Sequence, residues 1–512
     1  MRHLSARFHS IVCAGLLALI LPGAAAALAS MEEGKPADPN HRDPDGTTSL
    51  QWAVYEGNVA EVKRLLEAGA DVSLANNFGV TAMSLASEVA NTEVLRMLLK
   101  AGADADSPNP EGQTALMAVA RTGNLEAANL LLDRGAKVDA RERWGGQTAL
   151  MWASARRHPE MMRLLIAHGA DVNARSTNRD YQRHVTAEGR PKNLDSGGFT
   201  PLLYAARENC MACVEVLLKS GADINLPDPD GVSPLMVAIM NANWDLAKQL
   251  IEAGADINQW DVYGEAPLFA ALGVRNKVDG GRASIDPLNK TDGMTIVRML
   301  LDLGANTNMQ LFFQPASVSG STNTRGTTPL IRAANDGDLD LVNLLLKHGA
   351  DATIYMADRQ TPIHAVLAGR AQEKQALELI RVLHKAGTDV NVVALVNHRE
   401  EVRGGTALHF AVRKRFKEVI RELASYGIDM NARDQDGLTA LDYTQSRGFM
   451  PFMALQTPVY EAEAALLREL GATVEVARNP VWPVLGPPQG IWADIPPLGE
   501  TRVYEPIYQH DK

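Results

Sequence analysis

The chain has 512 residues, of which 46% are hydrophobic and 5% aromatic, and its formal net charge at neutral pH is −11. A hydrophobic share of this size is ordinary for a folded chain. An acidic surface repels phosphate backbones and anionic lipid headgroups, so we expect neither nucleic acid nor a membrane surface as a partner.

The first 29 residues are typical of a secretory signal peptide. Arg2 and Arg7 provide positive charge ahead of an apolar run at 11–21, which is too short to span a bilayer. The sequence Ala27-Leu28-Ala29 predicts cleavage after Ala29. An uncleaved N-terminal anchor is the alternative. The mature chain has 48 basic and 61 acidic residues, a net charge of −13, and we expect it to be periplasmic or secreted without an integral membrane segment.

After a linker at 30–44, the chain repeats one sequence motif, in which apolar residues and a short polar pair precede a Gly-Ala-Asp type turn. The first three intervals between the turn glycines are 33, 33 and 34 residues. A fixed period near 33 indicates a solenoid in which each unit covers the apolar face of the next. The turn glycines are Gly69, Gly102, Gly135, Gly169, Gly221, Gly254, Gly304, Gly349, Gly387, Gly427 and Gly471.

The third unit shows how one repeat forms two helices. Thr114 is a natural N-cap residue for a short apolar helix that ends at Gly123. A second helix is predicted at about 125–134, with Leu130, Leu131 and Leu132 as its buried stripe. Because helices this short are unstable alone in water, the neighbouring unit must cover them. In four other units proline follows the cap residue, where its missing N–H costs nothing: Pro201, Pro234, Pro329 and Pro362.

Several motif positions recur in phase and resemble the ankyrin repeat. They include Thr361-Pro362-Ile363-His364-Ala365, Thr406-Ala407-Leu408-His409-Phe410-Ala411 and Gly169-Ala170-Asp171-Val172-Asn173-Ala174. The resemblance covers about 45–473 and implies about eleven repeats. It implies an all-α solenoid of helix–turn–helix units with β-hairpin loops, used for binding other proteins.

The chain departs from the ankyrin pattern at the histidine of the Thr-Pro-Leu-His phrase. Only His364 and His409 keep it, whereas Met117, Met151 and Met236 replace it in three units. In the family this histidine makes structural hydrogen bonds at the start of the helix. Its loss puts the stability of single units in doubt more than the fold.

The period is interrupted by insertions at 174–196, 273–293 and 309–324, and also at 392–403 and 446–458. Insertions in solenoids often lie on a binding face, although long surface loops also cost little free energy. The proline-rich tail at 474–512 carries four aromatic residues, and either caps the last repeats or binds a partner.

Cys210 and Cys213 are the only cysteines after the predicted signal peptide, and they lie where the fifth unit turns from its first to its second helix. In an oxidising compartment we expect a local disulfide. Unpaired thiols are one alternative, and a thiol-redox site, which also uses Cys-x-x-Cys at a helix start, is another. A zinc site needs two further ligands, and none has the required spacing.

No motif of a hydrolase, a metalloprotease or a phosphate-binding loop is present, so we expect no enzymatic activity and no cofactor. The aspartates of the repeated turn are interpreted as turn formers. They include Asp71, Asp171, Asp223 and Asp256.

Four aromatic residues are predicted at the tips of the loops, where they do not serve the core between helices: Phe78, Trp144, Trp260 and Tyr263. Exposed aromatic residues are typical anchors of protein interfaces, so we expect these four to bind a partner. Trp52, Trp152 and Tyr204 are expected on the first helices, facing the concave surface. The alternative is that these aromatics fill gaps between loops.

The leading hypothesis is an exported, non-enzymatic scaffold that binds partner proteins through its concave face and loop tips. The alternative is an exported thiol-redox or enzyme-accessory protein that uses Cys210 and Cys213.

Overall fold

The structure, a computed structural model, describes residues 38–178, 197–275, 289–312, 325–395, 404–435, 437–444 and 460–473. The predicted signal peptide, the proline-rich tail and the greater part of the insertions lie outside these residues. Residues 38–44, which the sequence placed in a linker, are bonded to the first unit, because the Asn40 side chain accepts the backbone N–H of Asp71.

The described chain forms eleven successive units, and each of the first ten contains two antiparallel α-helices. In the eleventh unit a 3₁₀ helix replaces the first α-helix. The first elements of the units are, in order, α3 (Ser49–Tyr55), α5 (Ala82–Glu88), α7 (Ala115–Thr122), α9 (Ala149–Ala155), α11 (Pro201–Arg207), α13 (Pro234–Met240), α15 (Pro267–Val274), α17 (Pro329–Asp336), α19 (Pro362–Ala368), α21 (Ala407–Lys414) and η1 (Asp442–Thr444).

The second helices run the opposite way and end at the repeated glycine turns. They are α4 (Val59–Glu67), α6 (Thr92–Lys100), α8 (Leu125–Leu132), α10 (Pro159–Ala167), α12 (Met211–Lys219), α14 (Trp244–Glu252), α16 (Gly293–Asp302), α18 (Leu339–Lys347), α20 (Glu373–Lys385), α22 (Lys417–Ser425) and α23 (Glu461–Glu469).

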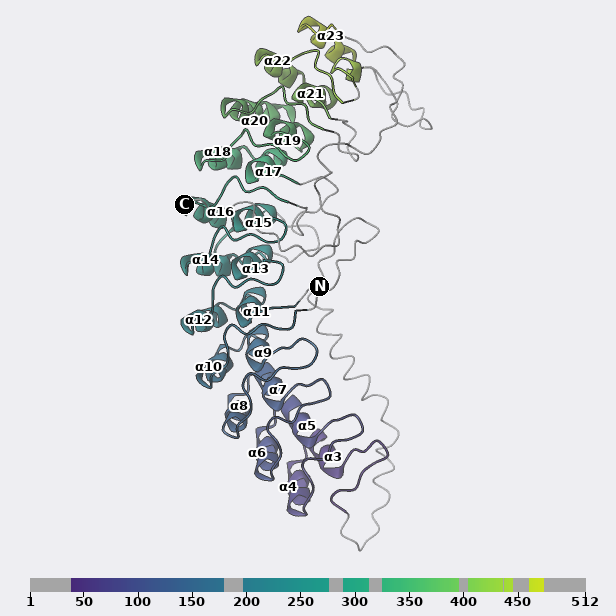
Figure 1. Cartoon of the computed structure of the whole chain (residues 1–512), viewed down its shortest axis with the longest axis vertical. Coiled ribbons are helices and arrows are strands. Elements are labelled where there is room, and N and C mark those ends of the chain that lie inside the picture. The colour runs from purple at the N-terminus through teal and green to yellow at the C-terminus, as the bar shows by residue number, and fades with distance from the viewer. Residues whose placement is uncertain are drawn as a thin grey trace.

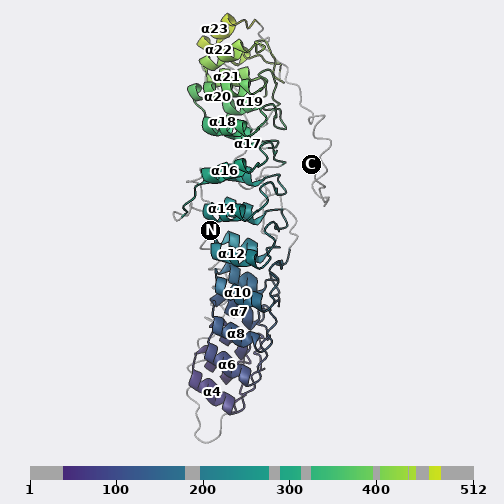
Figure 2. The ribbon, with the colours of Figure 1, turned by 90° about the vertical axis from the view of Figure 1, so that its left-hand side faces the viewer.

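The units stack into a curved solenoid (Figure 1). First helices contact first helices of neighbouring units along one column, and second helices form a parallel column on the outer, convex side. The loops that join one unit to the next project beyond the first helices on the inner side. Seen from the side, they form one row along the stack (Figure 2). The fold is therefore the all-α solenoid that the repeat predicts.

The third unit shows why the sequence forms these helices. The Thr114 hydroxyl accepts the backbone N–H of Met117 and caps α7, and Gly123 ends the helix in the left-handed conformation with φ of +77°. The helix α8 ends at Leu132, two residues before the predicted end. Leu131 is fully buried and Leu132 nearly so, whereas Leu130 is half-buried. Both predicted helices are confirmed.

The core is one continuous apolar layer that runs between the two columns through all eleven units. Leucine and alanine supply most of it, and the indole of Trp244 is its largest fully buried side chain. Each unit completes the apolar surface of its neighbour, so the stability of one unit depends on the next.

Single β-bridges close the loops in place of longer strands among the described residues. They pair, for example, Arg42 with Thr48 in the first unit and Arg433 with Thr439 in the last. Side chains also link successive turns. Asn173 accepts the backbone N–H of Asp223, and Asn225 accepts that of Asp256. These bonds repeat along the stack and fix the spacing of the units.

Candidate functional site

The tips of the inter-unit loops are stacked by backbone hydrogen bonds. The N–H of Asn77 donates to the carbonyl of Asp45, and that of Arg143 donates to Glu111. Side chains at the tips are therefore held at regular positions along the inner rim of the solenoid. A row of fixed side chains on one rim is a surface that a second protein can contact without reordering the loops.

Trp144 is the most exposed of the predicted tip residues, with 65% of its surface accessible. The buried carboxylate of Glu142 holds its loop, because its oxygens accept the backbone N–H groups of Trp144, Gly145 and Gln147 at 2.6, 2.6 and 3.1 Å. Charge-assisted bonds of this kind fix a loop more firmly than neutral ones. The indole is therefore displayed on a rigid turn, with the exposed Arg143 beside it.

Phe78 occupies the corresponding tip of the second unit and is 52% exposed. The side-chain oxygen of Asn76 accepts the N–H groups of Phe78 and Val80 and fixes this turn. Phe78 and Trp144 lie two units apart, so the structure places them on the same rim without joining them in one pocket.

The predicted exposure of Tyr263 is wrong, because only 4% of this residue is accessible. The eighth unit closes over this turn: the N–H of Phe312 donates to the Tyr263 carbonyl at 2.8 Å. The Phe312 ring lies so near Gly264 that an added Cβ would come within 3.0 Å of it. Tyr263 therefore contributes to packing in this structure, and the prediction that it binds a partner has no exposed surface to support it.

Trp260 is half-buried and packs edge-to-face against Phe312, with 5.6 Å between the ring centroids. Phe312 and Tyr355, on the next two tips, are exposed. The Gln310 amide links their turns, since it donates to the carbonyls of Gly326 and Tyr355. Sequence reasoning missed Phe312 and Tyr355. Tyr355 stands at the same position of the repeat as Trp260, and this equivalence was the signal that could have identified it. Phe312 stands at the edge of an insertion, so its position in the repeat cannot be assigned from the sequence.

The aromatics of the first helices differ in burial. The indole N–H of Trp52 donates to Asp43 at 2.8 Å, while the hydroxyl of Tyr204 accepts from the Gln147 amide at 2.5 Å. Tyr204 is buried beside Phe199, and the guanidinium of Arg207 lies 5.0 Å from its ring centroid. These contacts favour the gap-filling interpretation for Tyr204, whereas Trp52 and Trp152 remain half-exposed.

The aspartates of the repeated turn are structural, as predicted. The carboxylates of Asp71, Asp171, Asp223 and Asp256 each accept the backbone N–H two residues further along. The hydroxyl and N–H of Ser73 lower the pKa of Asp71 in this way. Among the described residues, no group of three or more acidic, histidine or cysteine side chains has the geometry to hold a metal ion.

The two retained histidines make the structural bonds expected of them. His364 Nδ1 accepts the N–H of Thr361, and its Nε2 donates to the carbonyl of Gly405 in the next unit at 3.1 Å. His409 bonds in the same way to Thr406 and to the Leu438 carbonyl. Burial lowers the pKa of His364 to about 4, so the ring is neutral at neutral pH.

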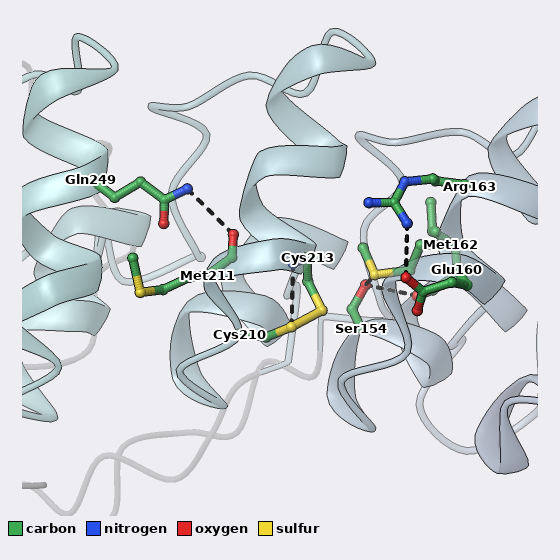
Figure 3. Close-up of a disulfide and its surroundings, with 9 residues drawn as sticks. Ser154, Glu160, Met162, Arg163, Cys210, Met211, Cys213 and Gln249 are labelled. Carbon is green, nitrogen blue, oxygen red and sulfur yellow. Dashed lines mark hydrogen bonds and ion pairs between the residues drawn. A yellow bond between two sulfur atoms is a disulfide. The ribbon is translucent and has the colours of Figure 1, made fainter. Parts of the chain in front are cut away.

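The structure joins Cys210 and Cys213 in a disulfide at the start of α12 (Figure 3). Cys210 is the N-cap residue of that helix, and its Sγ accepts the N–H of Cys213 at 3.2 Å. A cross-link over so few residues restrains little of the unfolded chain, about 2 kcal/mol against about 4.7 kcal/mol for a loop of 100 residues. It also lies within one helical turn and ties no unit to another.

Comparisons with known proteins agree with this architecture. A family model of ankyrin repeats in three copies matches residues 16–109, 101–176 and 367–449, and one of many ankyrin repeats matches 319–365. Single ankyrin repeats match 197–229 and 230–259. This chain is an ankyrin repeat protein. Ankyrin repeats imply a surface for protein–protein interaction.

Curated relatives are similar over parts of the chain. The nuclear factor NF-kappa-B p105 subunit of Gallus gallus is 30% identical over 164 residues, 31% of this chain and 14% of the relative. The B-cell lymphoma 3 protein of Homo sapiens is 33% identical over 158 residues, 29% of this chain and 30% of the relative. The chain thus spans less than a third of these relatives' length.

A solved structure, the crystal structure of the ankyrin repeat domain of Bcl-3, is 29% identical with a TM-score of 0.37, covering 44% of this chain and 94% of that domain. In the described part of this chain, no helix combines the length and apolar character needed to cross a membrane.

Proposed function

We propose that this chain is an exported, non-enzymatic scaffold that binds partner proteins along the inner rim of its solenoid, with Trp144 as the principal anchor. The observation that carries the proposal is a large indole, 65% exposed, on a turn fixed by the carboxylate of Glu142. Because the turn is already ordered, binding loses little conformational entropy there. Phe78 and the half-buried Trp260 extend the rim on either side.

The proposal of export is supported by the N-terminal sequence, in which a basic start, an apolar run and Ala27-Leu28-Ala29 form a signal-peptide pattern. The mature chain then acts in the periplasm or outside the cell. Cell fractionation tests this part separately. Mature chain found in the periplasm or medium supports export, and accumulation of uncleaved chain in the cytosol contradicts it.

Binding is tested by capture of partners on the immobilised chain, with quantitative mass spectrometry of the proteins retained. Trp144→Ala is compared with Leu303→Ala, a matched control that removes an apolar side chain 60% exposed at the end of α16, a helix of the outer column. Loss of an interface anchor worth 2 kcal/mol weakens binding about 30-fold. We expect Trp144→Ala to lose partners that Leu303→Ala retains. Equal capture by both variants, with unchanged helicity, would refute Trp144 as the anchor.

A further inference from the structure

We propose that the Cys210–Cys213 disulfide is an exchangeable redox site that oxidises the dithiol of a partner protein. This site lies at the start of α12, where the fifth unit turns from its first to its second helix, and does not depend on the scaffold proposal. Three features support it: the position of Cys210 at a helix start, the pocket beside it and the small structural role of the bond.

The first feature is that Cys210 takes the place of a capping residue. In units one to three, the side-chain oxygens of Asn58, Asn91 and Asn124 cap the second helix. In unit five, the Sγ of Cys210 accepts the corresponding N–H. A thiolate is a stronger acceptor than a disulfide sulfur, and the positive end of the helix dipole stabilises it. Reduction therefore creates a better cap, which favours the reduced form.

The second feature is a pocket of about 390 Å³ that Cys210 lines together with Arg157, Asp245 and Asn289. The carboxylate of Asp245 is occupied, since it accepts the N–H groups of Lys290 and Thr291. Arg157 is the basic residue among those described that line the pocket. Cys210 is 5% exposed and lines this pocket, whereas Cys213 is fully buried and does not. An incoming sulfur therefore approaches Cys210 through the pocket.

The third feature is that the helix does not need the bond. The amide of Gln249 donates to the carbonyl of Met211 at 3.3 Å and holds the first turn of α12 against unit six (Figure 3). Val214 and Leu217 anchor α12 in the continuous core through their own side chains. The chain can thus pass between oxidised and reduced forms without unfolding the stack.

In the reaction, a thiolate of the partner attacks Sγ of Cys210. The bond to Cys213 breaks, and Cys213 leaves with the electron pair and takes up the proton released by the attacking thiol. The second thiol of the partner then attacks the partner's own sulfur in the mixed disulfide and releases Cys210. Two electrons and two protons pass to the chain, and the partner dithiol becomes a disulfide.

The first test equilibrates the full chain with an equimolar amount of reduced thioredoxin, followed by acid quenching and alkylation. Mass spectrometry of the peptide that contains Cys210 and Cys213 keeps Cys13 out of the measurement. An exchangeable disulfide is easier to reduce than that of thioredoxin, so we expect more than half of the chain to become reduced. A structural disulfide is harder to reduce than that of thioredoxin and would stay mostly oxidised. If half or less is reduced at equilibrium, the bond is a structural one and the proposal is overturned.

The second test asks which sulfur reacts. In Cys213→Ser, we expect Cys210 to form a mixed disulfide with an oxidised dithiol probe, and to react with it at least tenfold faster than Cys213 does in Cys210→Ser. Cys210→Asn restores the cap of units one to three and controls for folding. Equal rates in the two serine variants, with helicity matching that of Cys210→Asn, would contradict the assigned direction of attack.

Discussion

Units three and four differ from units nine and ten at the third residue of the first helix. Met117 and Met151 fill this position in the former, His364 and His409 in the latter, and all four side chains are buried. Each histidine side chain donates to a carbonyl of the next unit. The methionines pack in the apolar core, and the Met117 sulfur accepts the N–H of Thr114 within its own unit. The comparison teaches that the contact between a first helix and the next unit can be made by a histidine hydrogen bond or by apolar packing. We expect only the stability of the histidine contact to depend on pH.

The first unit uses a third solution. The side-chain oxygen of Gln51 accepts the N–H of Thr48. Its amide nitrogen donates to the carbonyls of Leu74 and Val80 in the loop that leads to unit two. Loss of the histidine therefore does not by itself remove the hydrogen bond between units. The predicted weakening of single units applies only where an apolar residue replaces the histidine.

The largest expected effect tests whether the two regions differ anywhere besides the first helices. Leu131 in unit three and Leu383 in unit nine are fully buried and hold the same register, since each carbonyl accepts the N–H of the residue after the turn glycine. Leu131→Ala and Leu383→Ala should each cost about 2–5 kcal/mol in the free energy of unfolding, measured by urea denaturation. An effect below about 0.5 kcal/mol at either site would show that its second helix is not packed as described.

The next effect is the pH dependence of the histidine junctions. Burial depresses the pKa of His364 to about 4, whereas a histidine in the unfolded chain titrates near 6.5. The stabilising contribution is complete above pH 6.5 and is lost as the pH falls towards 4, because only the unfolded state then binds the proton. The loss amounts to about 3 kcal/mol. Hydrogen exchange of α19, corrected for intrinsic rates, should show about 2 kcal/mol of this loss between pH 7.5 and 5. Burial also lowers the pKa of His409, so α21 should weaken in the same direction.

A matched variant separates this effect from other titrations. His364→Met gives unit nine the residue that unit three already has, so the pH dependence of α19 should fall to that of α7. An unchanged pH dependence in this variant would assign the effect to other groups.

An effect of opposite sign is expected at the turn of unit seven. Burial, and then the neighbouring carboxylate of Glu265, raise the pKa of Asp261 to about 7. Stability is therefore complete below pH 3.8 and declines as the pH rises through 7. Asp261→Asn keeps the oxygen that accepts the N–H groups of Tyr263 and Glu265, as Asn76 does in unit two. It should stabilise the chain by about 4 kcal/mol at pH 8 and by little at pH 4. Thermal unfolding at both pH values checks this, and equal stability at pH 8 contradicts it.

The sequence was sufficient for the fold because its signals are local. A cap such as Thr114 and a left-handed glycine such as Gly123 act within one turn of a helix, and the period then fixes which apolar faces meet. The position of the Cys210–Cys213 pair between two helices followed from the same phase.

The exposure of the tip residues could not be predicted from their register. Trp144 directly precedes Gly145 and Tyr263 directly precedes Gly264 at their loop tips, yet Trp144 is exposed and Tyr263 is buried. The difference arises from the following tip, because Phe312 closes against the turn of Tyr263. Phe312 stands at the edge of the insertion at 309–324, where the period of the repeat is interrupted, so the period could not place it.

The central claim, that the rim around Trp144 contacts a partner protein, is tested most directly by site-specific photocrosslinking in living cells. A photoreactive amino acid is placed at position 144 and, as a control with similar exposure, at position 303 at the end of α16, a helix of the outer column. The account predicts discrete crosslinked protein adducts from position 144 and none of these from position 303. Identical adducts from both positions, or none from position 144 in folded chain, would contradict it.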